Sequence, residues 1–251
     1  DRMDSSLYSH KFKKKEYLIT NYKYGYDSLT DLGYRGVRGT SLESNYIKNR
    51  IDSDVYMPGF YKLIIPTNIT PYGTVAKTSY IGTPVKLKTI KKGDIVFGGE
   101  GYGKGKSFVV LENEENVATN YHGIRIVCEK DQSMTQKVFV KCVLTYLREK
   151  GLIDNYGVGG NGGHFAPAYF YLAKIPNFPE EKVKEIASLY HNNIVEYNTA
   201  NCTMKDFLEF DNKFNEQVGI YEIDKSLKYL QEKLNLAIRN IADNVEVDIA
   251  F

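Results

Sequence analysis

The chain has 251 residues, an ordinary hydrophobic content of 42% and a formal net charge of +2. This length is enough for one large domain, or for one domain with an appendage. No apolar run approaches the roughly 18 residues that span a membrane, so the sequence predicts no transmembrane helix. The three cysteines are far apart and form no CxxC pair, which argues against a zinc site or a disulfide framework and favours the reducing cytoplasm.

The charge is unevenly divided along the chain. Residues 1–110 contain 18 Lys and Arg against 10 Asp and Glu, a balance of +8, whereas residues 111–251 contain 15 against 21, a balance of −6. Several tyrosines stand beside basic residues in the first half, among them Tyr22, Tyr24, Tyr34 and Tyr102. A basic segment rich in tyrosine suits contacts with phosphates and bases. It also suits an ordinary solvated sheet surface.

The first half of the chain has the pattern of short strands. We expect strands at 61–65, 94–97, 106–111 and 123–127, where β-branched and aromatic residues recur. Pro66 ends the first of them, and residues 68–73 have the composition of a turn. Residues 1–130 are therefore predicted to be mainly β.

Helical patterns dominate from residue 135 onward. A helix is expected at 135–150, ended by Gly151, and a glycine-rich loop at 157–163 precedes a strand at 172–176. Pro179 begins a second helix, whose apolar residues recur at helical spacing as far as Ile194. The sequence thus predicts an α+β fold, with one domain at 1–178 and a helical region at 179–251.

The last predicted helix, at 224–242, has apolar residues at alternating steps of three and four. They are Leu227, Leu230, Leu234, Ala237 and Ile241. This spacing is that of a short coiled coil of about two to three heptads. An amphipathic helix packed on its own domain has the same pattern, so both interpretations remain open.

Residues 98–107 form a Gly/Lys loop that has two interpretations. Gly105, Lys106 and Ser107 match the end of a phosphate-binding loop, but Glu100 stands where the first glycine of that motif is required. The residues after Ser107 are typical of a strand, whereas a phosphate-binding loop needs a helix there. A glycine-rich hairpin is favoured, and a nucleotide-binding enzyme is the alternative.

No catalytic or metal-binding pattern is present. The four histidines lack HxxxH and HExxH spacing: His10, His122, His164 and His191. Asp94, beside a glycine, is interpreted as a turn residue rather than as the partner of Glu100 in a carboxylate pair. We therefore predict no catalytic residue and no metal ligand in this chain.

Several segments, in their order along the chain, resemble one family. They are residues 2–8 (RMDSSLY), 61–73 (YKLIIPTNITPYG), 80–82 (YIG), 92–97 (KGDIVF), 159–163 (GGNGG) and 172–176 (LAKIP). This order is similar to that of target-recognition domains in the specificity (S) subunits of type I restriction–modification systems. The recognition domains of adenine-N6 DNA methyltransferases are of the same type. The resemblance covers residues 1–190, and residues 196–222 match nothing in it.

The resemblance implies a β-rich DNA target-recognition domain with C-terminal helices. The implied function is sequence-specific binding of double-stranded DNA. The chain has one recognition domain where a full subunit has two, so the resemblance implies either a half-subunit or an excised recognition domain. Methylation would come from a methyltransferase (modification) subunit that binds S-adenosylmethionine, or from a missing part of the same protein, with cleavage by a restriction subunit. The adenine methyltransferase motif Asn/Asp-Pro-Pro-Tyr/Phe is absent, because the chain contains no Pro-Pro pair.

Such a half-subunit would form a homodimer through the helix at 224–242 and would act in the prokaryotic cytoplasm, at the nucleoid. A protein-interaction module is a further alternative. It would bind its partner without a salt-sensitive affinity for DNA.

Four loops carry the candidate DNA contacts. Their residues are Arg35, Arg38, Thr40 and Ser41; Asn68, Thr70 and Tyr72; Lys104 and Lys106; and Asn161 and His164. Arginine reads guanine and asparagine reads adenine by paired hydrogen bonds, which favours Arg35 or Arg38 and Asn68 or Asn161 as base readers. The two lysines are expected at phosphates. The resemblance supplies no reader motif residue by residue, and each of these residues could instead cap its own turn.

Overall fold

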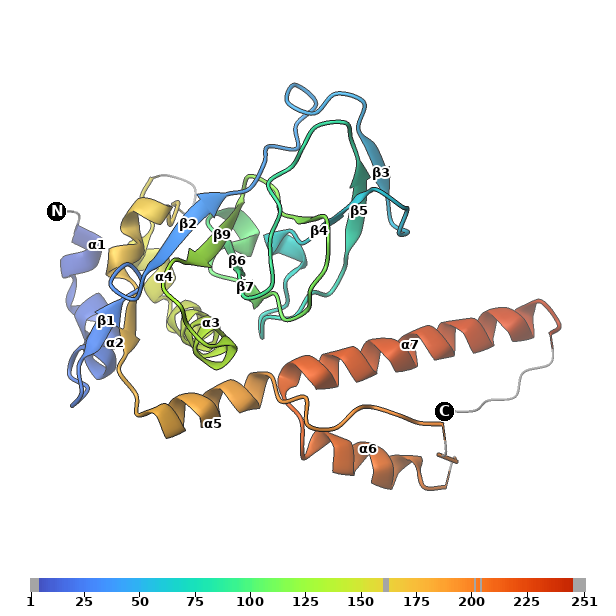
Figure 1. Ribbon diagram of the computed structural model, residues 1–251. Helices are drawn as coiled ribbons and strands as arrows, with labels where there is room; N and C mark the ends of the chain where they lie inside the picture. The colour runs from blue at the N-terminus through green and yellow to red at the C-terminus, as the bar shows by residue number, and fades with distance from the viewer. Residues whose placement is uncertain (1–4, 160–162, 201, 204, 246–251) are drawn as a thin grey trace. The chain divides into compact units, whose positions relative to one another are not determined.

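The computed structural model describes residues 5–159, 163–200, 202–203 and 205–245 (Figure 1). The chain forms two compact units, residues 1–183 and 184–251. Unit 1 contains all the described strands together with helices, and unit 2 is helical. The predicted α+β class is confirmed. No helix in the described part of the chain combines the length and the apolar character that a membrane crossing requires.

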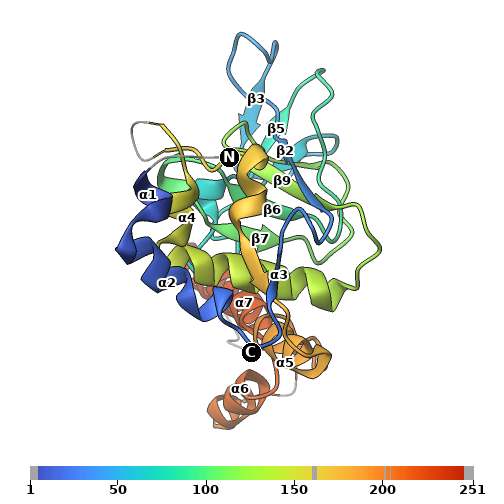
Figure 2. The same cartoon turned by 90° about the vertical axis from the view of Figure 1, so that its left-hand side faces the viewer.

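A four-stranded antiparallel sheet forms the centre of unit 1, in the order β2-β9-β6-β7. Its strands are β2 (Tyr34–Arg38), β9 (Gly123–Cys128), β6 (Ile95–Gly98) and β7 (Ser107–Val109). All four residues of β6 are buried, as expected for an inner strand covered on both faces. Helix α3 (Met134–Glu149) packs against β7 and runs below it in Figure 2.

A second four-stranded sheet has the order β3-β5-β4-β8. Its strands are β3 (Ile51–Ser53), β5 (Ser79–Gly82), β4 (Tyr61–Leu63) and β8 (Val117–Ala118), and only the β4–β8 pair is parallel. Its core contains Leu63, Ile81 and Ala118, joined by Ile47 and Leu87 from the loops. A two-stranded ribbon pairs β1 (Tyr26–Ser28) with β10 (Lys174–Pro176).

Helix α3 confirms the helix expected at 135–150. The Ser133 hydroxyl accepts a hydrogen bond of 3.2 Å from the Gln136 N–H and so caps the first turn. Gly151, at φ 68°, ends the helix in the left-handed conformation that glycine adopts without strain. The buried face of α3 includes Phe139, Leu144 and Leu147. The short helix α4 (Leu152–Tyr156) follows directly.

The expectation of a mainly β segment is wrong for the first described residues, which form α1 (Ser5–Tyr8) and α2 (His10–Thr20). The Ser9 hydroxyl accepts from the Phe12 N–H and caps α2. Phe12, Glu16 and Ile19 lie on its buried face at helical spacing. Glu16 is ion-paired with Lys174 at 3.0 Å, which offsets the cost of burying its carboxylate.

Three short 3₁₀ helices connect the strands of unit 1: η1 (Pro66–Asn68), η2 (Gly101–Gly103) and η3 (Pro167–Leu172). The strand expected at 172–176 is therefore shorter than predicted, because η3 extends to Leu172 and only β10 remains. Pro167 fixes the first φ of η3, and Phe170 is its buried residue.

Unit 2 is built around two helices, α6 (Phe207–Asn215) and α7 (Ile220–Ala242). Tyr197 packs its ring against Phe210, Phe214 and Tyr229 and so joins the two helices. The preceding helix, α5 (Glu180–Tyr190), crosses the division between the units. It ends before Ile194, so the helical spacing predicted to continue that far is wrong; Ile194 is exposed.

Helix α7 begins four residues earlier than predicted, and Ile220 and Ile223 thereby continue the spacing of three and four. We call the resulting apolar row the α7 seam: Ile220, Ile223, Leu227, Leu230, Leu234, Ala237 and Ile241. Leu227, Leu234 and Ile241 are 59%, 54% and 59% exposed. These three residues are therefore not buried within unit 2 among the described residues, and the coiled-coil interpretation stays a prediction.

Candidate nucleic-acid interface

The loop between β6 and β7, residues 98–106, is a tightly closed hairpin. The Gly98 N–H donates to the Lys106 carbonyl at 2.9 Å, and the Gly105 N–H donates back to the Gly98 carbonyl at 2.8 Å. A Cβ at Gly98 would lie 1.9 Å from the Gly103 carbonyl oxygen, so only glycine permits this approach. Strand β7 follows directly, where a phosphate-binding loop requires a helix. The phosphate-loop interpretation is therefore wrong.

Segments far apart in sequence adjoin this hairpin. The Gly99 N–H donates to the His122 carbonyl at 3.0 Å, and the Gly99 carbonyl accepts from the Phe165 N–H at 2.9 Å. On the far side of the 120–123 turn, the Gly39 N–H donates to the Gly123 carbonyl at 2.9 Å. Lys106 donates from Nζ to the Thr67 carbonyl at 3.3 Å. Parts of all four candidate loops thus lie next to one another.

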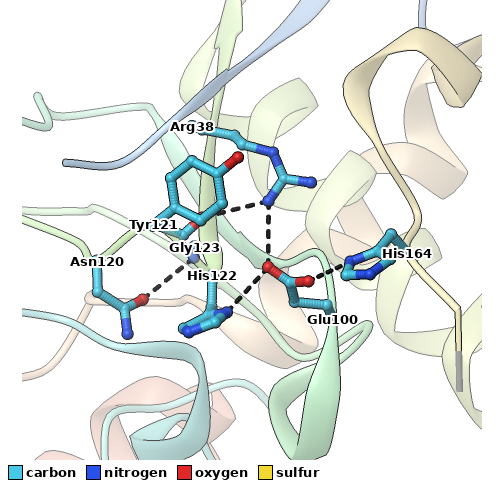
Figure 3. Close-up of polar contacts among 7 residues, drawn as sticks. All are labelled: Arg38, Glu100, Asn120, Tyr121, His122, Gly123 and His164. Carbon is cyan, nitrogen blue, oxygen red and sulfur yellow. Dashed lines mark hydrogen bonds and ion pairs between the residues drawn. The ribbon is translucent and has the colours of Figure 1, made fainter. Parts of the chain in front are cut away.

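One carboxylate, that of Glu100, connects three of these segments (Figure 3). Its Oε1 atom accepts from Nδ1 of His122 at 2.9 Å and pairs with Nη1 of Arg38 at 3.3 Å. Its Oε2 atom accepts from Nδ1 of His164. The Arg38 guanidinium lies over the Tyr121 ring, 4.8 Å from its centroid, and also donates to the Tyr121 carbonyl. We call Arg38, Glu100, Tyr121, His122 and His164 the Glu100 cluster.

The surroundings of Glu100 keep it ionised. Burial acts to raise the pKa of this carboxyl, but the hydrogen bond from His122 opposes it, together with the positive charges of His164, His122 and Arg38. The net result is a pKa below the ordinary value for glutamate. At neutral pH the carboxylate is therefore a fixed acceptor for the three cationic or polar side chains around it.

The cluster faces solvent through its nitrogen-containing and aromatic side chains. The Glu100 side chain is only 12% exposed, whereas those of His122 and His164 are 63% and 51% exposed. Tyr121 is also exposed. The buried member therefore organises the exposed members, which is the arrangement that a site for an external polar ligand needs.

The first candidate segment was predicted to be a loop, but this is wrong for Arg35 and Arg38, which lie on strand β2. The segment is only partly engaged in the cluster. Arg38 belongs to it, whereas Arg35, three residues earlier on β2, is exposed and ion-paired with Glu129. The Thr40 hydroxyl accepts from the Lys88 N–H at 3.1 Å, and Thr40 forms a β-bridge with Asn120. Ser41 follows, half-buried.

The second candidate loop is fixed by its own turn and by α3. The hydroxyls of Thr70 and Thr74 are 3.1 Å apart, and the Thr74 N–H donates to the Thr70 hydroxyl. Tyr72 exposes its ring, while its carbonyl accepts from Nζ of Lys141 at 2.9 Å. Asn68 is half-buried at the end of η1.

The third candidate loop uses its lysines for internal contacts. Lys104 is ion-paired with Asp154 of α4 at 2.7 Å, and its side chain is only 10% exposed. Burial, and after it the charge of Arg148, lowers the pKa of Lys106. To reach a phosphate, Lys104 would first have to leave Asp154. In the fourth loop His164 belongs to the Glu100 cluster, and Asn161 lies outside the described residues.

Lys141 of α3 is a buried cation that the sequence does not reveal. Its side chain lies against Gly73, where a Cβ would be 2.2 Å from Nζ. Burial lowers the pKa of Lys141 to about 8. This lysine ties the turn at 70–74 to α3 through the Tyr72 carbonyl.

Glu100, Tyr121 and His122 were not predicted from the sequence as site residues. The neighbours of Glu100 are 62, 22 and 64 positions away in sequence, and no local pattern indicates such contacts. The dipeptide Tyr121-His122 in a turn was the available signal. Asp94, by contrast, has the structural role expected of it: its carboxylate accepts from the Lys91 N–H and from Arg125. No group of three or more His, Cys, Asp or Glu among the described residues is arranged to hold a metal ion.

The chain is similar to solved structures of type I restriction–modification proteins. One is the crystal structure of the S subunit from M. genitalium, with 15% identity and a TM-score of 0.45 over 91% of this chain and 47% of that chain. Another is the HsdS subunit from Thermoanaerobacter tengcongensis, with 16% identity and a TM-score of 0.41 over 87% and 52%.

A third similar structure comes from work on the complex assembly and conformational transition of the type I R-M system, with 13% identity and a TM-score of 0.40 over 87% and 51%. The chain thus spans about half the length of these proteins. They belong to the family that the sequence motifs resemble. No protein-family model and no curated protein matches the sequence.

Proposed function

We propose that the chain is a sequence-specific reader of double-stranded DNA, and that it acts as a specificity half-subunit of a restriction–modification system. The observation that carries this proposal is the convergence of segments from four separate loops around the 98–106 hairpin, with the Glu100 cluster exposed among them. Polar side chains on loops that a rigid sheet positions are one means by which proteins read base edges.

The electrostatics of the chain supports the same function. The positive balance of residues 1–110 falls within unit 1, which carries the candidate loops. Basic residues neutralise phosphates and make the affinity strongly dependent on salt. Exposed tyrosines such as Tyr72, Tyr102 and Tyr121 add aromatic surface near the basic residues.

In this proposal the chain itself carries out no catalysis. A methyltransferase subunit, or a domain outside this sequence, binds S-adenosylmethionine and methylates adenine, and a restriction subunit cleaves where one is present. The chain supplies the choice of sequence. Its place of action is then the DNA of a prokaryotic cell.

The α7 seam is proposed to join two copies of the chain. Seven apolar residues at steps of three and four match the contact positions of a coiled coil. A two-fold dimer would present two copies of unit 1 to two half-sites, so that a chain with one recognition unit reads a split target.

The proposal is tested by selection of bound duplexes from a random pool, with and without a methyltransferase partner. Enrichment of one motif, with an affinity that falls steeply between low and physiological salt, is the expected result. A pool with no enriched motif under either condition would contradict the proposal. Binding to a protein partner without salt-sensitive affinity for DNA would support the protein-interaction module instead.

A further inference from the structure

We propose that Glu100 is a positioning residue that sets the sequence specificity of the interface, by holding Arg38 where its guanidinium reads a guanine. This inference rests on the proposed function and identifies the base that the Glu100 cluster reads. Glu100 would not touch the DNA. It would act through Arg38, which it fixes together with the Tyr121 ring.

The Arg38 guanidinium is held on one edge and on one face. Its hydrogen bonds to the described residues both come from Nη1, to Glu100 at 3.3 Å and to the Tyr121 carbonyl at 3.3 Å. The Tyr121 ring covers one face at 4.8 Å. Nε and Nη2, which donate to none of the described residues, are the proposed edge for an external pair of acceptors. The O6 and N7 acceptors of guanine match such a pair of donors.

The fixed orientation is what makes discrimination possible. A guanidinium on a flexible side chain contacts any phosphate, whereas one held in place can make paired hydrogen bonds only where two acceptors lie in register. The Arg38 side chain is only 23% exposed. Its neighbours therefore restrict its rotamers before DNA binds, which lowers the entropy cost of ordering it. Arg35, exposed at 56% and paired only at the surface, lacks this support.

The two imidazoles give the cluster a second property. Each donates from Nδ1 to Glu100, so in the neutral ring the other nitrogen, Nε2, is an acceptor. Glu100 thereby orients the rings of His122 and His164 as well as the guanidinium of Arg38. Its negative charge also offsets the charge of Arg38, which reduces the attraction of this pair for DNA phosphates.

These points lead to a result that a general structural role would not give. Glu100→Gln keeps the size of the side chain but removes its charge and one acceptor oxygen. Affinity for unrelated duplexes should rise slightly, because a negative charge is lost near the phosphates. Discrimination is the ratio of the affinity for the selected duplex to the affinity for the same duplex with its guanine replaced. This ratio should fall by about tenfold, the size typical of one paired base contact.

The experiment measures these two affinities with the full chain, under whichever condition of the selection enriches a motif. The matched control is Glu114→Gln, which removes the same charge from an exposed pair with Lys62. It should leave the ratio of the two affinities unchanged. In an Arg38→Met background, Glu100→Gln should lower the ratio no further, because the effect passes through Arg38.

The outcomes separate the two proposals. If no motif is enriched, the proposed function fails and this inference fails with it. If a motif is enriched but Glu100→Gln leaves discrimination unchanged at every base pair, only this inference is overturned. An equal loss at all base pairs would also overturn it, because a positioning role through one arginine relaxes specificity at one position.

Discussion

The Glu100 cluster and the α7 seam are both exposed, but they differ in the contacts that their side chains make. In the cluster, the carboxylate of Glu100 holds Arg38, His122 and His164 in a connected set of polar contacts. In the seam, residues such as Leu227 and Leu234 stand exposed on a single helix. The cluster is already organised before any ligand arrives, whereas the seam exposes apolar surface that association would cover.

This difference fits the two kinds of binding proposed above. A preorganised polar site gives specificity, because a ligand gains only where its donors and acceptors match. An apolar seam gives affinity, because its burial removes apolar surface from water with little dependence on the detailed partner geometry. We therefore propose DNA reading for the cluster and self-association for the seam, and each proposal is tested separately.

The largest effect is expected at the seam. Leu227→Glu combined with Leu234→Glu places charges where the proposed dimer buries apolar side chains, and should weaken dimerisation by roughly a thousandfold. Analytical ultracentrifugation measures this. The control is Asn235→Glu, off the seam on the same helix. A wild-type chain that sediments as a monomer at all concentrations would remove the role assigned to the seam.

The next effect is expected in the hairpin that carries Glu100. Gly98→Ala introduces a Cβ 1.9 Å from the Gly103 carbonyl oxygen, so the loop must shift, at a cost of about 3 kcal/mol in the free energy of unfolding. Gly101→Ala is the matched control: at φ +64° it meets no neighbour within 4 Å, and should cost only about 1 kcal/mol. Equal losses in the two variants, measured by urea unfolding, would contradict the geometry.

Lys141 provides a pH test of how the 70–74 turn is held. Its pKa is about 8 when folded against 10.5 as the ordinary value, so between these pH values the unfolded chain binds more protons. The free energy of unfolding should therefore rise with pH, by about 2 kcal/mol between pH 7 and pH 9.5 relative to Lys141→Met.

Urea titrations of the wild type and of Lys141→Met across this pH range measure the difference. Lys137→Met serves as the control for loss of a lysine from α3. Parallel pH profiles of the wild type and Lys141→Met would show that the ammonium is not buried as described.

The smallest effect is expected at the ring under Arg38. Tyr121→Leu removes the cation–π contact at 4.8 Å but keeps apolar bulk, and should lower discrimination at the guanine a few-fold. Competition binding with the selected and the guanine-replaced duplex measures this loss of discrimination. Tyr46→Leu, at another exposed tyrosine of unit 1, should leave discrimination as it is.

The elements with strong local signals could be predicted from the sequence. Helix α3 was predicted within one residue at each end, because apolar spacing and Gly151 mark it. The seam was visible in the steps of three and four, although its first two residues were not included. Helix α2 was missed, since its buried face contains the charged Glu16, whose partner Lys174 is distant in sequence.

The site was predicted only in part, and for the same reason. Arg38 and His164 were named, but nothing local indicates that Glu100 joins them. Conversely, Lys104 reads as an exposed loop lysine in the sequence, and only the fold places Asp154 within 2.7 Å of it. Contacts that depend on how loops converge are set by the whole fold, so residue type and spacing do not reveal them.

The most direct test of the account compares two affinities of the full chain at physiological salt, with its methyltransferase partner if selection requires it. One is for the duplex recovered by selection, and the other is for a scrambled duplex of the same composition. The account predicts that the selected duplex binds at least about a thousandfold more tightly. Equal affinities for the two duplexes would contradict it.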